Sequence, residues 1–169
     1  MASVRAEHPG DEAGIRLVNE PAFGQKTEAD LVDALRARDK LIVSLVAEHE
    51  GRIVGHIAFS RVTIDSEGRV LTGAGLAPMA VLPEMQGRGI GSMLVRDGLD
   101  RCREKAVDFV VVLGYPSYYP RFGFARASSF GIHCEYEAPD AAFMAIELRA
   151  GALVRAAGTA RFEPEFKEA

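Results

Sequence analysis

The sequence contains no tryptophan and only two cysteines, Cys102 and Cys134, among its 169 residues. Two cysteines are too few for a disulfide scaffold, and they do not form the C-x-x-C pair of redox motifs and zinc ribbons. Their scarcity is typical of proteins that work in a reducing compartment. We therefore expect two reduced thiols, no bound metal and a cytoplasmic protein.

Long hydrophobic runs and clusters of basic residues are also missing. No stretch approaches the roughly 18 apolar residues of a membrane-spanning helix, and the N-terminal residues lack the apolar region of a secretory signal. No run of five or more lysines and arginines occurs, and the formal net charge is −4, whereas nucleic-acid-binding proteins usually carry a basic face. We expect neither a nucleic-acid nor a membrane partner, although a local pocket for a small anion is compatible with this charge.

What is present is typical of one folded domain. The length lies within the roughly 100 to 200 residues of a single domain, and 48% hydrophobic with 26% charged residues is close to the globular average. A chain of this size can bury about 70% of the surface that its unfolded form exposes. A hydrophobic core without disulfides is therefore expected.

The N-terminal part predicts a short strand followed by two helices. Residues 4–7 can form an edge strand, and Asp11 is a candidate N-cap for a first helix with an apolar face up to Pro21. Thr27 opens a second helical pattern, with Asp30 three residues later in a weak version of the capping box.

Three strands are predicted next, at residues 41–47, 53–64 and 70–82, separated by short turns that contain glycine. Connections of two to four residues cannot form parallel crossovers, so the three strands predict an antiparallel meander. Alternation in the second strand places Ile53, Ile57 and Phe59 on one face and Val54, His56 and Ala58 on the other.

The C-terminal half predicts a β-α-β crossover. Residues 90–106 show a helical period, and the continuous apolar run 107–113 is typical of a strand buried on both faces. Residues 115–124 leave room for one helical turn, 141–148 can form a closing strand, and the tail from Gly151 has no strong pattern. The element order β-αα-βββ-α-β-α-β predicts a single α/β domain with a mixed, mainly antiparallel central sheet flanked by helices.

A glycine-rich segment joins the third strand to the long helix. Gly87, Gly89 and Gly91 stand where the helix begins; glycine lets the backbone approach a ligand closely, and the N–H groups of a helix N-terminus attract anions. Gln86 and Arg88 can add side-chain donors to a phosphate or pyrophosphate. The spacing is not the G-x-G-x-x-G of dinucleotide-binding folds, and the lysine of a P-loop is missing.

Two motifs resemble those of the GNAT superfamily of N-acetyltransferases. Residues 86–91, Gln-Gly-Arg-Gly-Ile-Gly, are similar to the superfamily's Q/R-x-x-G-x-G/A loop for the pyrophosphate of coenzyme A. Residues 119–124, Tyr-Pro-Arg-Phe-Gly-Phe, look like its Y-x-x-x-G-F signature. The element order resembles the family fold over residues 2–149, which we take as the GNAT domain, with 150–169 as a C-terminal extension. Residues 77–83 and 113–119 resemble the YhbS-like bacterial branch.

The resemblance implies a site for acetyl-CoA, as cosubstrate, on the glycine-rich loop and the strand before it. The implied CoA-binding residues are Met79, Ala80, Val81, Gln86, Gly87, Arg88, Gly89, Ile90, Gly91 and Ser92. A backbone N–H near Met79 to Val81 then serves as an oxyanion hole for the acetyl carbonyl. Tyr119 matches the family's general acid, which protonates the departing sulfur, and Tyr118 is a weaker candidate.

The general base and the acceptor are open at this point. Candidates for the base are Glu48, His49, His56, Glu84 and an ordered water. The resemblance places the acceptor between residues 11–38 and the loops near 130–138, where Glu135, Glu137 and Asp140 form an acidic stretch. Spermidine, aminoglycosides, amino acids, protein N-termini and lysines are all possible acceptors.

The resulting hypothesis is an N-acetyltransferase that acts by direct attack of a primary amine in a ternary complex. The alternative is a CoA- or acyl-CoA-binding sensor without turnover. A different acyl group or a hydroxyl acceptor is also open. A homodimer through an exposed sheet edge is a further expectation from the family.

Overall fold

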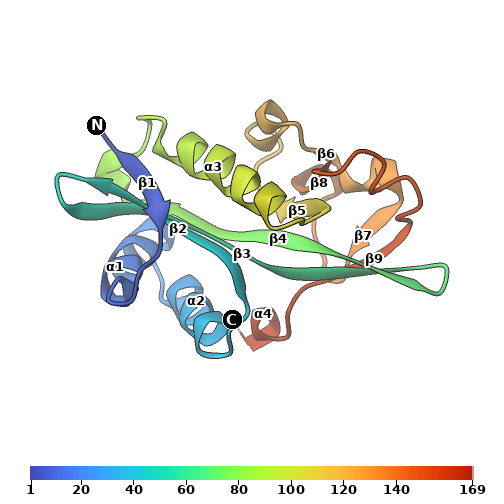
Figure 1. Ribbon diagram of the computed structural model, residues 1–169, viewed down its shortest axis with the longest axis horizontal. Coiled ribbons are helices and arrows are strands. Elements are labelled where there is room, and N and C mark those ends of the chain that lie inside the picture. Colours follow the sequence, from blue (N-terminus) through green and yellow to red (C-terminus); the bar gives the residue numbers. More distant parts are fainter. Residues whose placement is uncertain (169) are drawn as a thin grey trace.

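A mixed, mainly antiparallel β-sheet runs through the centre of the molecule, and helices cover both of its faces (Figure 1). The computed structural model describes residues 1–168. Within them the strand order is β1-β2-β3-β4-β5-β8-β6, and β9 pairs with both β3 and β7. The strands are β1 (Ser3–Ala6), β2 (Leu41–His49), β3 (Arg52–Ser66), β4 (Arg69–Val81), β5 (Phe109–Leu113), β6 (Ala125–Arg126), β7 (Ile132–Cys134), β8 (Phe143–Glu147) and β9 (Gly158–Arg161).

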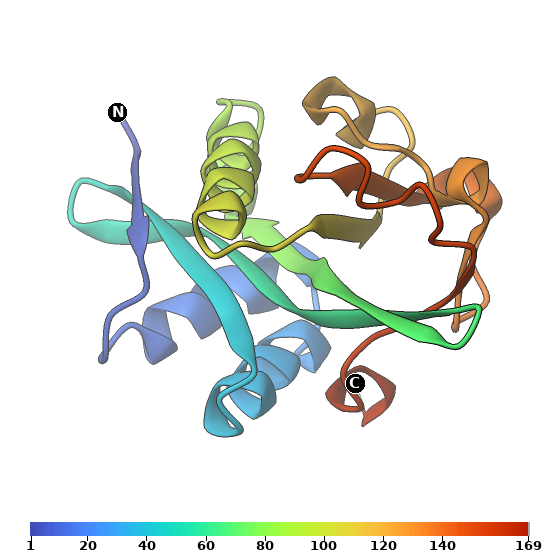
Figure 2. The same ribbon diagram turned by 45° about the vertical axis from the view of Figure 1, so that its right-hand side comes forward.

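Helices α1 and α2 lie on one face of the sheet and α3 lies on the other (Figures 1 and 2). The short C-terminal helix α4 lies next to α2, which places the end of the chain beside the N-terminal helices (Figure 2). The helices are α1 (Glu12–Phe23), α2 (Thr27–Ala37), α3 (Ile90–Glu104) and α4 (Glu165–Glu168). None of the helices in residues 1–168 is long and apolar enough to cross a membrane.

The predicted pairing of the strands is confirmed. β2, β3 and β4 form an antiparallel meander, and β4 and β5 are parallel neighbours on either side of the α3 crossover. β8 closes this part of the sheet antiparallel to β5. Short loops and a single helical crossover therefore determine this topology, as expected from the connection lengths.

The helix starts differ in detail from the prediction. Asp11 occupies the N-cap position of α1 without a capping bond, because its carboxylate pairs with Arg5 and accepts the His8 N–H. In α2 the cap is Lys26, so Thr27 is already helical and the predicted capping box with Asp30 does not form. α1 also continues past Pro21 to Phe23.

β3 carries the core on both faces. Ile57 and Phe59 lie under α3, where the Phe59 ring packs so closely on Gly98 that a Cβ there would stand 2.4 Å from it. His56 points to the opposite face, toward Asn19 of α1. Ile53 does not share the face of Ile57 and Phe59, so this part of the prediction was wrong. Ala47 pairs with Gly55 and Glu48 with Ile53, which leaves one extra residue in β3 between them. The resulting bulge turns Ile53 toward Gly14 of α1.

β4 and β5 separate toward the C-terminal end of β4, which leads to the start of α3. Their ladder stops at the pair Leu76 and Val112, whereas β4 continues to Val81 along β3 alone. Ile57 pairs with Met79 and Phe59 with Leu76, so β4 holds one extra residue at Ala77–Pro78, a bulge next to the point of separation. One edge of β4 is thereby left open to a ligand.

The segment after residue 150 is tied to the sheet. β9 pairs with β3 through Thr63, Ile64 and Asp65, and buried Glu165 accepts hydrogen bonds from Arg38 and Lys40 at the end of α2. The boundary between residues 149 and 150 stays a prediction, but the residues beyond it contribute a strand to the same sheet. Neither β9 nor the aromatic residues that follow it, Phe162 and Phe166, show a periodicity visible in the sequence.

Candidate active site

A groove of about 650 Å³ lies between the open edge of β4 and the N-terminus of α3. The loop that leads into α3 turns at Gly87 and Gly89, whose φ angles of +76° and +81° are strained for residues with a side chain. This turn aims the first N–H groups of α3, which have no partner within the helix, at the groove. The groove therefore has the geometry of an anion site.

Nine of the ten residues predicted to bind the cofactor line this groove. They are Met79, Ala80, Val81, Gln86, Gly87, Gly89, Ile90, Gly91 and Ser92. Arg88 is exposed on the loop and is not among the lining residues. Arg121 lines the groove instead, with its guanidinium 4.5 Å from the centre of the Tyr118 ring. Arg121 stands inside the Y-x-x-x-G-F signature, which is the signal by which it could have been found.

The backbone of β4 presents hydrogen-bonding groups to the groove. Leu82 donates its N–H to Val54 of β3, so alternation along the strand turns the N–H and C=O of Val81 and Met79 away from β3. The Val81 carbonyl accepts a hydrogen bond of 3.1 Å from the side chain of Gln86. The predicted phosphate donor Gln86 thus braces the loop against its own strand.

Tyr118 closes the groove from the opposite side. Its hydroxyl lies 3.0 Å from Ser92 Oγ, and a Cβ added to Gly91 would stand 3.2 Å from the same hydroxyl and 3.3 Å from Met79 Cε. The lack of a side chain at Gly91 is therefore what allows α3, Tyr118 and Met79 to meet.

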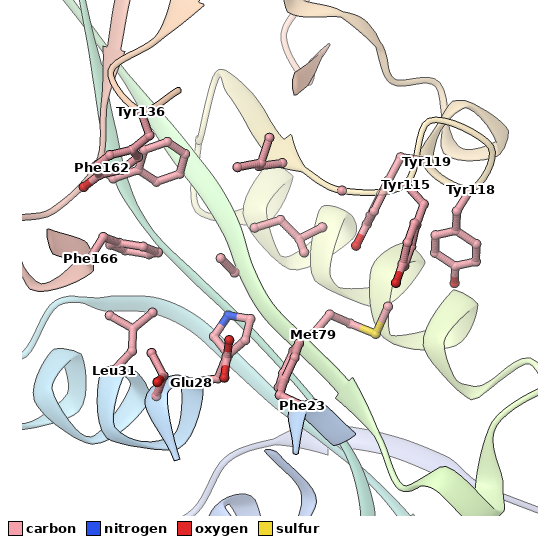
Figure 3. Close-up of a pocket in the computed structure, with 16 residues that line it drawn as sticks. Phe23, Glu28, Leu31, Met79, Tyr115, Tyr118, Tyr119, Tyr136, Phe162 and Phe166 are labelled. Carbon is pink, nitrogen blue, oxygen red and sulfur yellow. The ribbon is translucent and has the colours of Figure 1, made fainter. Parts of the chain in front are cut away.

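A second cavity, of about 420 Å³, adjoins the groove. Phe23, Met79, Tyr115 and Tyr118 line both spaces. In Figure 3 the tyrosines 115, 118 and 119 stand at one end of this cavity, with their hydroxyls toward Met79, and Tyr136, Phe162 and Phe166 gather at the other end. Two molecules bound in the two spaces would meet at Met79.

Tyr119 lies at the junction end of the second cavity. Its ring is 7% exposed and packs edge-on against Phe124 and onto Gly114, where a Cβ would come within 2.4 Å. Within residues 1–168 its hydroxyl has no hydrogen-bond partner, whereas that of Tyr118 pairs with Ser92. Burial raises the pKa of Tyr119 to about 12, so the phenol keeps its proton at neutral pH.

A family model described as "Acetyltransferase (GNAT) domain" matches residues 4–127. The chain belongs to the GNAT family of acetyltransferases. The anion site at the start of α3 and the open edge of β4 are thus features of a GNAT domain, and the predicted fold class is confirmed.

Relatives with known sequences and structures agree with the GNAT assignment. The chain is 36% identical to the uncharacterised N-acetyltransferase YhbS of Escherichia coli K12, over 96% of this chain and 97% of YhbS. A crystal structure of E. coli YhbS in complex with CoA matches with a TM-score of 0.92 and 35% identity, covering 98% of this chain and 92% of that one. A GNAT acetyltransferase from Brucella melitensis in complex with acetyl-CoA matches with a TM-score of 0.81 and 37% identity, over 98% of both chains.

The four candidates for the general base do not reach either cavity of this GNAT domain. Glu48 pairs with Arg5 on the β1 side of the sheet, His49 is 3.8 Å from Glu50 at a hairpin, and exposed Glu84 is 3.7 Å from Arg52. The acidic residues 135, 137 and 140 line neither space, since Glu135 accepts the N–H of Phe162 and Asp140 pairs with Arg126. The carboxylate that lines the second cavity belongs to Glu28, for which the sequence showed no signal beyond its place in a helix.

His56, the fourth candidate, is completely buried in a polar network. Ser44 donates its only proton to Glu7 Oε1 at 2.6 Å, so His56 Nε2 must donate to Ser44 Oγ at 3.0 Å and Nδ1 accepts from Asn19 at 3.3 Å. This arrangement satisfies a neutral imidazole. Burial lowers the pKa of His56 to about 4, so His56 is a structural residue.

The buried imidazole predicts acid sensitivity of the fold. His56 becomes protonated below about pH 6.5 in the unfolded chain but only below about pH 4 in the folded chain. The free energy of unfolding therefore has its full value above pH 6.5 and falls by about 3 kcal/mol as the pH drops to 4. Because glutamine does not titrate, we expect the free energy of unfolding of His56→Gln to lack this fall of about 3 kcal/mol between pH 6.5 and 4. The free energy of unfolding in urea, measured at pH 7, 5.5 and 4, tests this, with the exposed His133→Gln as control. Parallel curves for His56→Gln and wild type would show that His56 titrates normally.

Proposed function

We propose that this protein is an N-acetyltransferase that transfers the acetyl group of acetyl-CoA to a primary amine in a ternary complex. One observation carries the proposal: the groove beside α3 and the second cavity meet at Met79, Tyr115 and Tyr118. A thioester in the groove and an amine in the cavity are then held face to face, which favours direct attack.

The CoA part of the proposal rests on the anion site and on the relatives. The α3 N-terminus, Arg121 and the left-handed turns at Gly87 and Gly89 suit a pyrophosphate. The backbone groups of Met79 and Val81 suit the amide-bearing arm of the cofactor and the acetyl carbonyl. The solved relatives from E. coli and B. melitensis hold CoA and acetyl-CoA.

The chemical step forms a C–N bond between amine and acetyl carbon and breaks the C–S bond. The neutral amine attacks with its lone pair, and the carbonyl oxygen takes negative charge beside the β4 N–H groups. The nitrogen, now cationic, releases a proton to solvent as the carbonyl re-forms and the thiolate leaves. This proton balances the one that Tyr119 gives to the sulfur, and solvent restores the phenol. Tyr119 supplies the proton to the sulfur, because its hydroxyl is protonated at neutral pH and has no partner within the described residues. An alkylammonium has a pKa near 10.4, so only about one molecule in a thousand is neutral at pH 7 and the amine must lose a proton first.

The experiment has two steps. First, thermal unfolding is followed with acetyl-CoA, CoA, NAD and ATP; a ligand at about 100 times its Kd adds about 2.7 kcal/mol and raises Tm by several degrees. We expect shifts with the two CoA species alone. Second, CoA release from acetyl-CoA is measured with a thiol reagent across an amine panel. Binding of CoA without release for any amine would favour the alternative, a CoA-binding sensor, and no shift at millimolar CoA would overturn both.

A further inference from the structure

We infer that the acceptor is a monocationic primary amine with an apolar, preferably aromatic, body, and that Glu28 binds its ammonium group. This inference rests on the proposed function, since it names the substrate class of the same site. It is carried by the chemistry of the second cavity, whose far end is built by the C-terminal segment.

The walls of the second cavity are mainly apolar. Leu31 of α2, Leu76 of β4 and Leu113 of β5 line it together with the aromatic rings at its two ends (Figure 3). A cavity of about 420 Å³ with such walls favours a ligand that gains by leaving water. Strongly polar acceptors, such as aminoglycosides, would lose more hydrogen bonds to water than the Glu28 carboxylate and the few hydroxyl groups of the lining can replace.

Glu28 is the only charged side chain that lines this cavity among residues 1–168. It is half-buried in the first turn of α2, and its two carboxylate oxygens each lie 3.1 Å from the side-chain nitrogen of Gln25. It has no arginine or lysine partner within the described residues. Its negative charge is therefore free to bind one ammonium group.

The charge count of the cavity discriminates between the acceptors that the sequence left open. A free amino acid carries a carboxylate, and no basic side chain of the described residues lines the cavity to bind it. Spermidine carries three ammonium groups for one carboxylate. Burying a charge without a partner is costly, so both are disfavoured relative to an amine with one charge.

The aromatic end of the cavity is held firmly in place. The centres of the Phe162 and Phe166 rings lie 5.2 Å apart, and the Tyr136 ring lies tilted beside Phe162 with its centre 6.0 Å away. The two phenylalanines flank Glu163 and Glu165, which are buried on the other side and pair with Arg61, Arg38 and Lys40. These ion pairs fix the segment so that its phenyl rings face the cavity, where they can pack on an aromatic body.

The test compares matched amines with the whole protein and saturating acetyl-CoA. We expect kcat/KM for 2-phenylethylamine to exceed those for propylamine, spermidine and phenylalanine by at least about tenfold, since phenylalanine is the same amine with a carboxylate added. Phe162→Ala should reduce the ratio of phenylethylamine to propylamine by about tenfold. A higher kcat/KM for spermidine or for phenylalanine overturns the inference and leaves the transferase proposal standing.

Glu28→Gln is expected to raise KM for the amine about tenfold while kcat and KM for acetyl-CoA change less than twofold, because it removes an ion pair made both with the bound ammonium and with the nitrogen that becomes cationic during attack. Glu104→Gln, on the exposed end of α3, is the matched control and should behave as wild type. Glu28→Asp should recover part of the affinity. Equal KM values of the amine for Glu28→Gln and wild type would show that Glu28 does not bind the ammonium group.

Calorimetric binding of 2-phenylethylamine to the CoA complex separates the two proposals if no amine is acetylated. Millimolar or tighter binding that Glu28→Gln weakens supports the inferred pocket while the transferase proposal fails. No binding at 10 mM overturns the inference itself.

Discussion

Replacing Tyr119 by phenylalanine is expected to lower kcat by about 10²- to 10³-fold with little change in the Kd of CoA. The variant removes one oxygen and keeps the ring that packs on Gly114 and Phe124, so the fold and the groove persist. What is lost is the proton that Tyr119 gives to the sulfur of CoA, and a positioned general acid typically contributes 10²- to 10⁴-fold. Single-turnover kinetics with CoA detection measure the step directly.

Tyr118→Phe is the matched control for this variant. It removes a hydroxyl that already pairs with Ser92, and we expect less than a tenfold loss. The wild-type rate should also rise between pH 6 and 9.5 without a descending limb, since the pKa of Tyr119 is about 12 and the phenol stays protonated. A Tyr119→Phe variant whose kcat stays within about twofold of wild type across pH 6 to 9 would exclude Tyr119 as the acid.

Gly91→Val is expected to raise the Kd of CoA at least about 100-fold. Valine would bring two methyl groups to the point where α3, Tyr118 and Met79 converge, inside the groove. These methyl groups would displace the pyrophosphate from the N–H groups of the first turn, and each hydrogen bond to a charged group is worth about 1.5 to 3 kcal/mol. Because 1.4 kcal/mol is a factor of ten, the loss of two such hydrogen bonds reaches this fold-change.

Stability serves as an internal control for Gly91→Val. The better helix propensity of valine offsets part of the overpacking against Tyr118 and Met79, so we expect the unliganded Tm to fall by no more than several degrees and the protein to stay folded. Gly91→Ala is the graded variant: its Cβ meets only the ends of the flexible Tyr118 and Met79 side chains, at 3.2 and 3.3 Å, so we expect a change of a few-fold. Isothermal titration with CoA measures both. A Gly91→Val variant that binds CoA within threefold of wild type would place the cofactor elsewhere.

Several features of the groove could be predicted because they are local. The glycine pattern at the start of α3 predicts a backbone turn, at Gly87 and Gly89, and a close approach of neighbouring side chains to the helix, at Gly91. Both follow from the missing side chain of glycine. Arg88 was expected with them and lies outside the groove, because sequence spacing does not tell on which side of an exposed loop a long side chain points.

The second cavity could not be predicted, because its walls come from distant parts of the chain. Glu28 on α2, Leu113 at the end of β5 and Phe162 after β9 are brought together only by the sheet and the packing of α2 beside α4. His56 shows the same limit, since alternation placed it on one face of β3 correctly but only the tertiary structure decides whether that face meets water or Asn19 and Ser44.

By itself the sequence determined the order of the strands from β2 to β5, the anion site at the start of α3 and the membership suggested by its two motifs. These depend on alternation, short connections and glycine, whose effects act over a few residues. The tertiary structure decided the bulge next to the open edge of β4, the burial that raises the pKa of Tyr119, and the walls of the second cavity. These depend on contacts between residues far apart in the chain, which no local pattern encodes.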